Sequence, residues 1–324
     1  MRILITGGAG FIGSHLAERL IGEGHDVVVI DNLSTGDAMN LSAVKSHKQF
    51  TFIEGDILNT EDLRAAYNGV ELVFHLAAAV GVKYVIDNPL TSIHTNVLGT
   101  ENVFRLANER HCKVVLASTS EVYGKNDLPR LTENADRILG STSITRWSYS
   151  SSKALDEFIA FGYYKHYGLP VTIARLFNTC GPRQSARYGM VIPRLVEQAL
   201  KGKPLTVYGT GEQTRAFTFV HDTVSALVAI AFSDRCIGEV FNVGNEASAT
   251  TIKALAQRIK EKTGSASEIK YISFKEAYDS DFEDMMHRVP DTTKLRSYVG
   301  YDPMYPLDTV LDETIRFMRK KYEK

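Results

Sequence analysis

A glycine-rich turn between a strand and a helix constrains the fold of this chain more than any other feature. Residues 1–6 form a short apolar run typical of a buried strand, and residues 14–21 have the apolar spacing of a helix. Between them lie Gly7, Gly10 and Gly13, with the spacing G-x-x-G-x-x-G. Glycines here permit a tight turn and let the backbone approach a pyrophosphate, which the free N–H groups of the following helix can bind. The order predicts the first βαβ unit of a dinucleotide-binding fold; a βαβ turn without a ligand is the alternative.

The second expected strand ends in a carboxylate. Residues 26–30 are another apolar run, and Asp31 follows, roughly 20 residues beyond the glycine turn. A carboxylate at this place can accept hydrogen bonds from the ribose hydroxyls of NAD, and it would repel the additional phosphate of NADP. NAD is therefore the expected cofactor.

Composition excludes some classes of partner. The 324 residues exceed one average domain, and the hydrophobic and charged fractions, 44% and 23%, are ordinary for a globular protein with a sizeable core. A net charge of -1 gives no reason to expect nucleic acid or an anionic membrane surface as partner. The 3 cysteines have no metal-ligand or disulfide spacing, no apolar run is long enough to span a bilayer, and the chain starts with a core strand instead of a signal peptide. We expect a cytoplasmic protein without a metal site.

Strand-like and helix-like segments alternate through the first half. Apolar runs at 49–54, 70–74 and 112–117 are separated by helical patterns, among them 96–108. Strands and helices that alternate in this way form a parallel sheet covered on both faces. Right-handed crossovers then give a doubly wound α/β fold, the Rossmann arrangement, whose site lies at the carboxyl ends of the strands.

The residues that follow each strand are candidates for the cofactor site. Small residues after the fourth strand, such as Ala77 and Ala78, let a flat cofactor lie close to the backbone. Asp56 follows the third strand, where adenine would lie, and an aspartate that caps the next helix is the alternative. His75 is interpreted as a buried, hydrogen-bonded histidine. The expected cofactor-binding residues are Gly7, Gly10, Phe11, Ile12, Gly13, Asp31, Asn32, Ser34, Thr35, Gly36, Asp56, Ile57, Leu76, Ala77, Ala78, Asn96, Ser118, Tyr149 and Lys153.

Polar side chains gather at the end of the fifth strand and on the helix after it. The strand ends in Thr119, Ser120 and Glu121, at the mouth of the expected crevice. Tyr149 and Lys153 are four residues apart on the next helix and therefore share a face. A phenol with a pKa of ~10 is a poor base at neutral pH, but a nearby ammonium and a nicotinamide cation would both stabilise the phenolate. These five residues are the expected catalytic set; a polar loop and a chance spacing are the alternatives.

Together these motifs resemble the NAD-dependent nucleotide-sugar epimerase/dehydratase family, which consists of extended short-chain dehydrogenase/reductases. The resemblance covers the whole chain. It rests on residues 6–13, 31–32, 55–57, 75–78 and 118–120 and on the pair Tyr149 and Lys153.

The resemblance implies how the chain is divided and assembled. It predicts an NAD-binding Rossmann domain over 1–176, to which 212–244 return, and a smaller α/β domain over 177–324 that binds the nucleotide sugar. It also predicts a homodimer that pairs through the helices 95–108 and 149–167, as a four-helix bundle.

In the second half, the resemblance implies a pocket for a UDP-sugar. The expected substrate-binding residues are Asn178, Arg187, Val191, Val207, Tyr208, Arg215 and Arg288. Asn178 and the backbone near Val191 would hold the sugar diphosphate, and Val207 and Tyr208 would pack near the uracil. Arg215 and Arg288 would pair with the phosphates, which guanidinium groups bind through two hydrogen bonds, whereas an isolated arginine is more often a surface residue. Arg187, or else Arg183, is the hypothesised partner of a uronate carboxylate.

The resemblance also implies a mechanism. Tyr149 would remove the proton from a sugar hydroxyl while NAD accepts the hydride from the same carbon. Thr119 would hydrogen-bond that oxygen, and Lys153 would bind the nicotinamide ribose. The 4-keto sugar could then return the hydride to the opposite face, eliminate water across C5 and C6, or lose a C6 carboxylate as carbon dioxide.

Two groups of residues favour different outcomes. Residues 146–149 and 181–190 look most like UDP-glucuronate and UDP-glucose 4-epimerases, so we expect an isomerase that inverts C4 of UDP-glucuronate or UDP-glucose. The strand end 119–121 with Arg288 favours the alternative, a UDP-glucuronate decarboxylase. Ser120 stands where 4,6-dehydratases have an aspartate, so a dehydratase comes third. A NAD-sensing relative without catalysis is disfavoured because the expected catalytic tyrosine and lysine are both present.

Overall fold

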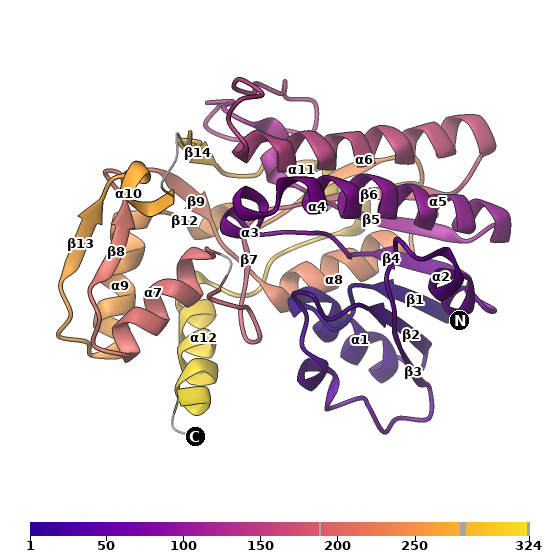
Figure 1. The fold of residues 1–324 in the computed structure, drawn as a ribbon, viewed down its shortest axis with the longest axis horizontal. Coiled ribbons are helices and arrows are strands. Elements are labelled where there is room, and N and C mark those ends of the chain that lie inside the picture. The colour runs from indigo at the N-terminus through magenta and orange to yellow at the C-terminus, as the bar shows by residue number, and fades with distance from the viewer. Residues whose placement is uncertain (188, 279–282, 323–324) are drawn as a thin grey trace.

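The computed structural model describes residues 1–187, 189–278 and 283–322. Its centre is a seven-stranded sheet with the strand order β11-β6-β5-β4-β1-β2-β3 (Figure 1). These strands are β1 (Arg2–Thr6), β2 (Asp26–Asp31), β3 (Phe50–Glu54), β4 (Leu72–His75), β5 (Lys113–Thr119), β6 (Val171–Leu176) and β11 (Val240–Val243). All neighbouring pairs among them are parallel, which confirms the predicted doubly wound α/β fold.

Helices cover both faces of the sheet. One face carries α1 (Phe11–Gly22) and α8 (Val220–Ala231), and the other carries α2 (Thr60–Ala66), α5 (Gly99–Arg110) and α6 (Arg146–Tyr167). Successive residues of a strand point to opposite faces. Ile3 and Ile5 therefore join the core beside α1, whereas Leu4 joins the core beside α5.

Short elements join the strands on the side where the site lies. They are η1 (Ala38–Leu41), α3 (Val82–Asp87), α4 (Pro89–Ile93), η2 (His94–Leu98) and η3 (Ser120–Tyr123). The helix expected over 96–108 thus begins with one turn of π-helix, η2, before α5 continues it. Such π turns are often found at functional sites.

After β6 the chain builds a smaller α/β part beside one end of the large sheet (Figure 1). Its elements are β7 (Thr179–Cys180), α7 (Val191–Leu200), β8 (Leu205–Tyr208), β9 (Thr214–Ala216), β10 (Thr218–Phe219), η5 (Glu246–Ser248), β12 (Ala249–Thr251), α9 (Ile252–Thr263), β13 (Ile269–Ile272), α10 (Phe274–Tyr278), β14 (His287–Arg288) and α12 (Leu307–Tyr322). Two further elements pack with the large α/β part: η4 (Asp234–Cys236) beside α8, and α11 (Thr293–Val299) beside β11. The short strands pair as β10-β7, β12-β9-β14 and β13-β8. Strand β11 lies beside β6, so the chain passes through the large sheet again; the division into domains at 176 and 177 stays a prediction.

None of the helices in the described part of the chain has the length and apolar character to cross a bilayer. None of its histidine, cysteine, aspartate and glutamate side chains form a group of three or more that could hold a metal ion.

Candidate active site

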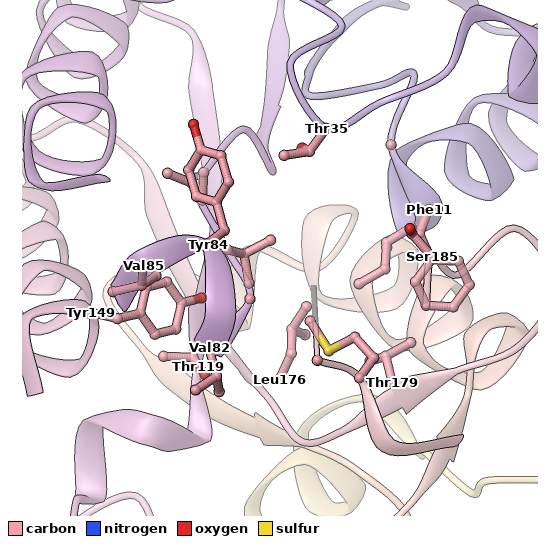
Figure 2. Close-up of a pocket in the computed structure, with 18 of the residues that line it drawn as sticks. Phe11, Thr35, Val82, Tyr84, Val85, Thr119, Tyr149, Leu176, Thr179 and Ser185 are labelled. Carbon is pink, nitrogen blue, oxygen red and sulfur yellow. The ribbon is translucent and has the colours of Figure 1, made fainter. Parts of the chain in front are cut away.

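One cavity of about 540 Å³ runs along the carboxyl ends of the strands, from the glycine turn to the smaller α/β part. Figure 2 shows Tyr149 and Thr119 on one side of it and Phe11 and Ser185 on the opposite side. Of the expected cofactor and catalytic residues, those that line the cavity are Gly7, Gly10, Phe11, Ile12, Gly13, Asp31, Asn32, Ser34, Thr35, Asp56, Ile57, Leu76, Ala77, Ala78, Ser118, Thr119, Ser120, Glu121, Tyr149 and Lys153. Of the expected substrate residues, the lining includes Asn178, Val191, Tyr208, Arg215 and Arg288.

The glycine turn at one end of the cavity has no room for side chains. Gly7 has a φ of +71°, and a Cβ on it would lie 2.8 Å from the Cα of Ala77 at the end of β4. A Cβ on Gly13 would lie 2.5 Å from the carbonyl oxygen of Gly7. The bare backbone at the start of α1 therefore faces the cavity, as a pyrophosphate site requires.

Asp31 is fixed beside this turn by backbone hydrogen bonds. Its Oδ2 accepts the N–H of Ala9 at 2.9 Å, and its Oδ1 accepts the N–H of Leu33 at 2.8 Å. Burial raises the pKa of Asp31, and these hydrogen bonds lower it by less. The carboxylate is thus oriented at the cavity wall by its local turn.

Four expected site residues lie outside the lining. Asn96 is buried behind the wall, where its Oδ1 accepts the N–H of Ala79 at 2.8 Å. Gly36 packs on Asp31, and Val207 points into the core because side chains alternate along β8. Arg187 is exposed to solvent.

Thr119 and Tyr149, two of the expected catalytic residues, lie close together in the cavity lining. Thr119 caps η3, because its Oγ1 accepts the N–H of Glu121 at 3.2 Å. Burial raises the pKa of Tyr149, and the carboxylates of Glu121 and Asp156 raise it further. A hydrogen bond with Thr119 and the charge of Arg288 oppose this increase in the pKa of Tyr149.

The sugar end of the cavity is a buried network of charges. Arg288 Nη1 lies 3.2 Å from Glu121 Oε1, and Arg146 Nη1 lies 3.5 Å from Glu121 Oε2. Asp284 Oδ1 lies 2.9 Å from Arg215 Nη2 and 3.5 Å from Arg146 Nη2. Burial raises the pKa of Glu121, but Arg146 and Arg288 outweigh burial and hold it below its usual range. Glu121 is therefore ionised at neutral pH.

Sequence reasoning missed two members of this network. Arg146 begins α6, three residues before Tyr149, and this spacing was the available signal: it places Arg146 about one turn from the expected base. Asp284 precedes β14 and offered no such signal, because it reaches the cavity only through the pairing of β14 with β9. Arg183, the second hypothesised carboxylate partner, lines the cavity but lies 2.5 Å from Glu18 of α1.

Comparison with known proteins identifies the family. Residues 4–314 match the GDP-mannose 4,6 dehydratase family. The chain belongs to this family. A solved structure of the same fold, described as UDP-glucuronic acid 4-epimerase from Bacillus cereus in complex with UDP-glucuronic acid and NAD, is 29% identical with a TM-score of 0.90. The match covers 99% of this chain and 100% of that chain.

Two relatives that match almost the whole of this chain are named as decarboxylases. UDP-N-acetyl-alpha-D-glucosaminuronate decarboxylase from Bacillus cytotoxicus is 43% identical over 324 residues, 98% of each chain. UDP-glucuronic acid decarboxylase 1 from Xenopus tropicalis is 38% identical over 324 residues, 99% of this chain and 73% of that protein. These names contradict the prediction of a 4-epimerase and of an isomerase, and they support the decarboxylase alternative. The prediction was wrong because it gave more weight to residues 146–149 and 181–190, which resemble epimerases, than to the strand end 119–121, which favours a decarboxylase.

Proposed function

We propose that this protein is an NAD-dependent decarboxylase of a UDP-linked uronate. NAD is the cofactor, and the described residues fit it. Gly7 and Gly13 leave the backbone bare where a pyrophosphate would lie, and the Asp31 carboxylate lies at the wall where a ribose would lie. The Ala77 and Ala78 backbone lines the same cavity between this turn and Tyr149.

The observation that carries the proposal is the group of three largely buried arginines at the sugar end. Among the described residues of the charge network, Arg146, Arg215 and Arg288 face two carboxylates, Glu121 and Asp284. A site lined by several largely buried guanidinium groups favours an anionic ligand. A UDP-uronate carries a diphosphate and a carboxylate, and both relatives are named for substrates of this class. We infer that Arg215 faces the diphosphate and that Arg146 faces the carboxylate.

The expected catalytic residues then have definite roles. When bound, NAD supplies the hydride acceptor for the sugar C4 and the hydride donor that later reduces the ketone. Tyr149 takes the proton of the C4 hydroxyl, and Thr119 orients that oxygen. The ketone lies β to the carboxylate, so the C5–C6 bond breaks with its electrons drawn toward the ketone oxygen, and carbon dioxide leaves. The resulting enolate takes up a proton from solvent at C5, Tyr149 returns its proton to the C4 oxygen when the ketone is reduced, and the net reaction takes up one proton.

Glu121 holds two cations at the reacting sugar. Because Arg146 and Arg288 keep the pKa of Glu121 below its usual range, this carboxylate is a poor proton donor at neutral pH. Its proposed role is to orient the two guanidinium groups toward the carboxylate and the developing negative oxygen. Ser120, also in the cavity lining, has a buried hydroxyl without a hydrogen-bond partner among the described residues.

The test is to incubate the purified, NAD-loaded protein with UDP-glucuronate and, separately, with UDP-N-acetylglucosaminuronate. Each substrate carries an isotope label in its carboxyl carbon, and the sugar product is analysed by mass spectrometry and proton NMR. We expect labelled carbon dioxide and a UDP-pentose from at least one substrate. Unchanged mass with an inverted C4 in both incubations would overturn the proposal.

We also propose that the protein is a homodimer that pairs through α5, α6 and the turns before α5. Leu90, Leu98, Leu155 and Phe158 are exposed apolar side chains on α4, η2 and α6, which lie side by side in Figure 1; Phe158 is 64% exposed. Apolar side chains grouped in this way favour a protein interface. By light scattering, Phe158→Glu should give a monomer and Phe232→Glu, at an exposed phenylalanine after α8, should not. A monomeric parent protein would contradict this proposal.

The predicted cytoplasmic location stays a prediction.

A further inference from the structure

The lysine of the expected catalytic pair has a buried counter-ion. Asp156 lies three residues after Lys153 on α6, and its Oδ2 lies 2.7 Å from Lys153 Nζ. The exposed fractions are 0% for Asp156 and 2% for Lys153. A buried ion pair gains little net stability, because the desolvation of both charges offsets their attraction. A contribution to stability therefore gives little reason for this ion pair, and a functional role is the better explanation.

The surroundings of Asp156 are polar. His75 of β4 lies between two hydroxyls: Thr6 Oγ1 is 2.7 Å from its Nδ1, and Thr100 Oγ1 is 2.9 Å from its Nε2. Burial, assisted by the charge of Lys153, lowers the pKa of His75 to about 3, so its ring is neutral at pH 7. The hydroxyl of Thr100 on α5 lowers the pKa of Asp156, as Lys153 does. Among the described residues, Lys153 alone neutralises this carboxylate.

The Asp156 carboxylate raises the pKa of Tyr149. The groups that influence Tyr149 come from four elements: Glu121 of η3, Asp156 of α6, Thr119 of β5 and Arg288 of β14. After burial, Glu121 and Asp156 are the contributors that raise the pKa of Tyr149. A lysine beside a tyrosine is expected to favour the phenolate, and a carboxylate 2.7 Å from that lysine cancels part of the effect.

We propose that Asp156 is a positioning residue for the catalytic pair: its carboxylate anchors the Lys153 ammonium and offsets its charge, so that Tyr149 forms its phenolate only at higher pH or with the cofactor cation present. The inference rests on the proposed function, because it takes Tyr149 as the base. It assigns Thr100 and His75 a supporting role, since Thr100 of α5 acts on the carboxylate and His75 of β4 is hydrogen-bonded to Thr100. It goes beyond the proposed function by coupling the base to cofactor occupancy.

The test compares the parent protein with Asp156→Asn, which keeps the side-chain volume and removes the charge. The NAD-loaded proteins are titrated by ultraviolet difference spectroscopy of tyrosinate, with the matching Tyr149→Phe proteins subtracted. We expect the Tyr149 midpoint of Asp156→Asn to lie about one pH unit lower, and the acid limb of kcat/KM to move by the same amount. Thr100→Val is the matched control: it alters the same buried cluster but keeps the anion, so its Tyr149 midpoint should not fall.

The outcomes separate a tuning role from a structural one. If folded Asp156→Asn loses activity at every pH while the Tyr149 midpoint stays in place, the proposal is overturned. If Asp156→Asn does not fold, because Lys153 is left without a counter-ion, Lys153→Met is compared with Lys153→Met/Asp156→Asn. The double variant should then titrate lower, and equal midpoints would overturn the proposal. Neither titration depends on release of carbon dioxide, so failure of the proposed reaction is seen separately in the product assay.

Discussion

The two ends of the cavity are built in different ways. At the cofactor end, the wall includes glycine and alanine backbone from 7–13 and 76–78, and the main carboxylate, Asp31, is held by backbone N–H groups. At the sugar end, the wall includes long charged side chains that hold one another. Arg288 and Glu121 meet there although 167 residues separate them in the sequence. One end is therefore fixed by local backbone geometry, and the other by long-range charge pairing.

This difference suggests a division of tasks. Backbone geometry tolerates little change, and it provides a rigid seat for a cofactor that every catalytic cycle needs. Charge pairs can exchange partners, so Asp284 and Glu121 can balance the arginines until substrate anions arrive. Tyr149 and Lys153 lie in the lining between the two ends. Variants in each part should consequently affect different steps.

The largest expected effect is at Tyr149, between the two ends of the cavity. Tyr149→Phe removes the proposed base without removing packing volume, so kcat should fall by about 10³-fold, within the range for a general base. Binding of NAD and of the UDP-sugar, measured by calorimetry, should change little because neither end of the cavity is altered. A variant that retained more than a tenth of the parent kcat would show that Tyr149 is not the base.

The next effect belongs to the cofactor end. Gly13→Ala places a Cβ 2.5 Å from the Gly7 carbonyl oxygen, so the turn must shift. We expect NAD binding to weaken about 10- to 100-fold, which corresponds to an overpacking cost of about 1–3 kcal/mol. Gly22→Ala is the matched control, because it lies on the same helix with no neighbouring atom within 4 Å of its added Cβ. Equal losses in both variants would mean that helix α1, and not the turn, was disturbed.

A smaller and more selective effect is expected at the sugar end. In a Tyr149→Phe background, Arg146→Gln should weaken binding of UDP-glucuronate by about 10-fold or more, as expected for a lost hydrogen bond between charged groups. Binding of the UDP-pentose that lacks only the carboxylate should change much less. Arg187→Gln tests the original hypothesis in parallel; because Arg187 is exposed outside the lining, it should leave both affinities unchanged. Selective loss in Arg187→Gln alone would restore Arg187 and remove Arg146 from this role.

The sequence predicts the cofactor end of the cavity better than the sugar end. The strand–glycine–helix order, the Asp31 position and the small residues after β4 are local patterns, and each was found in the lining. Local patterns gave less at the sugar end, where Asp284 reaches the cavity through the pairing of β9 with β14 and Arg146 meets Glu121 of η3 from the start of α6. Proximity in sequence did not bring every candidate into the lining. Arg187 lies near the lining stretch 189–191 in the chain, yet it is exposed and outside the lining.

The subtlest prediction compares the pH dependence of stability at the two ends. Arg146 and Arg288 lower the folded-state pKa of Glu121, so its ion pairs stabilise the fold above the unfolded pKa of about 4.3, and this contribution is lost as the pH falls through the folded-state pKa. Burial raises the folded-state pKa of Asp31, so its contribution falls as the pH rises above its unfolded pKa of about 3.9. From pH about 3 to neutral, the Tm difference between parent and Glu121→Gln should therefore widen, and that between parent and Asp31→Asn should narrow. The Tm values come from thermal melts at each pH. If both Tm differences changed with pH in the same direction, the two carboxylates would be in similar environments, contrary to the contrast between an end built from backbone and an end built from charged side chains.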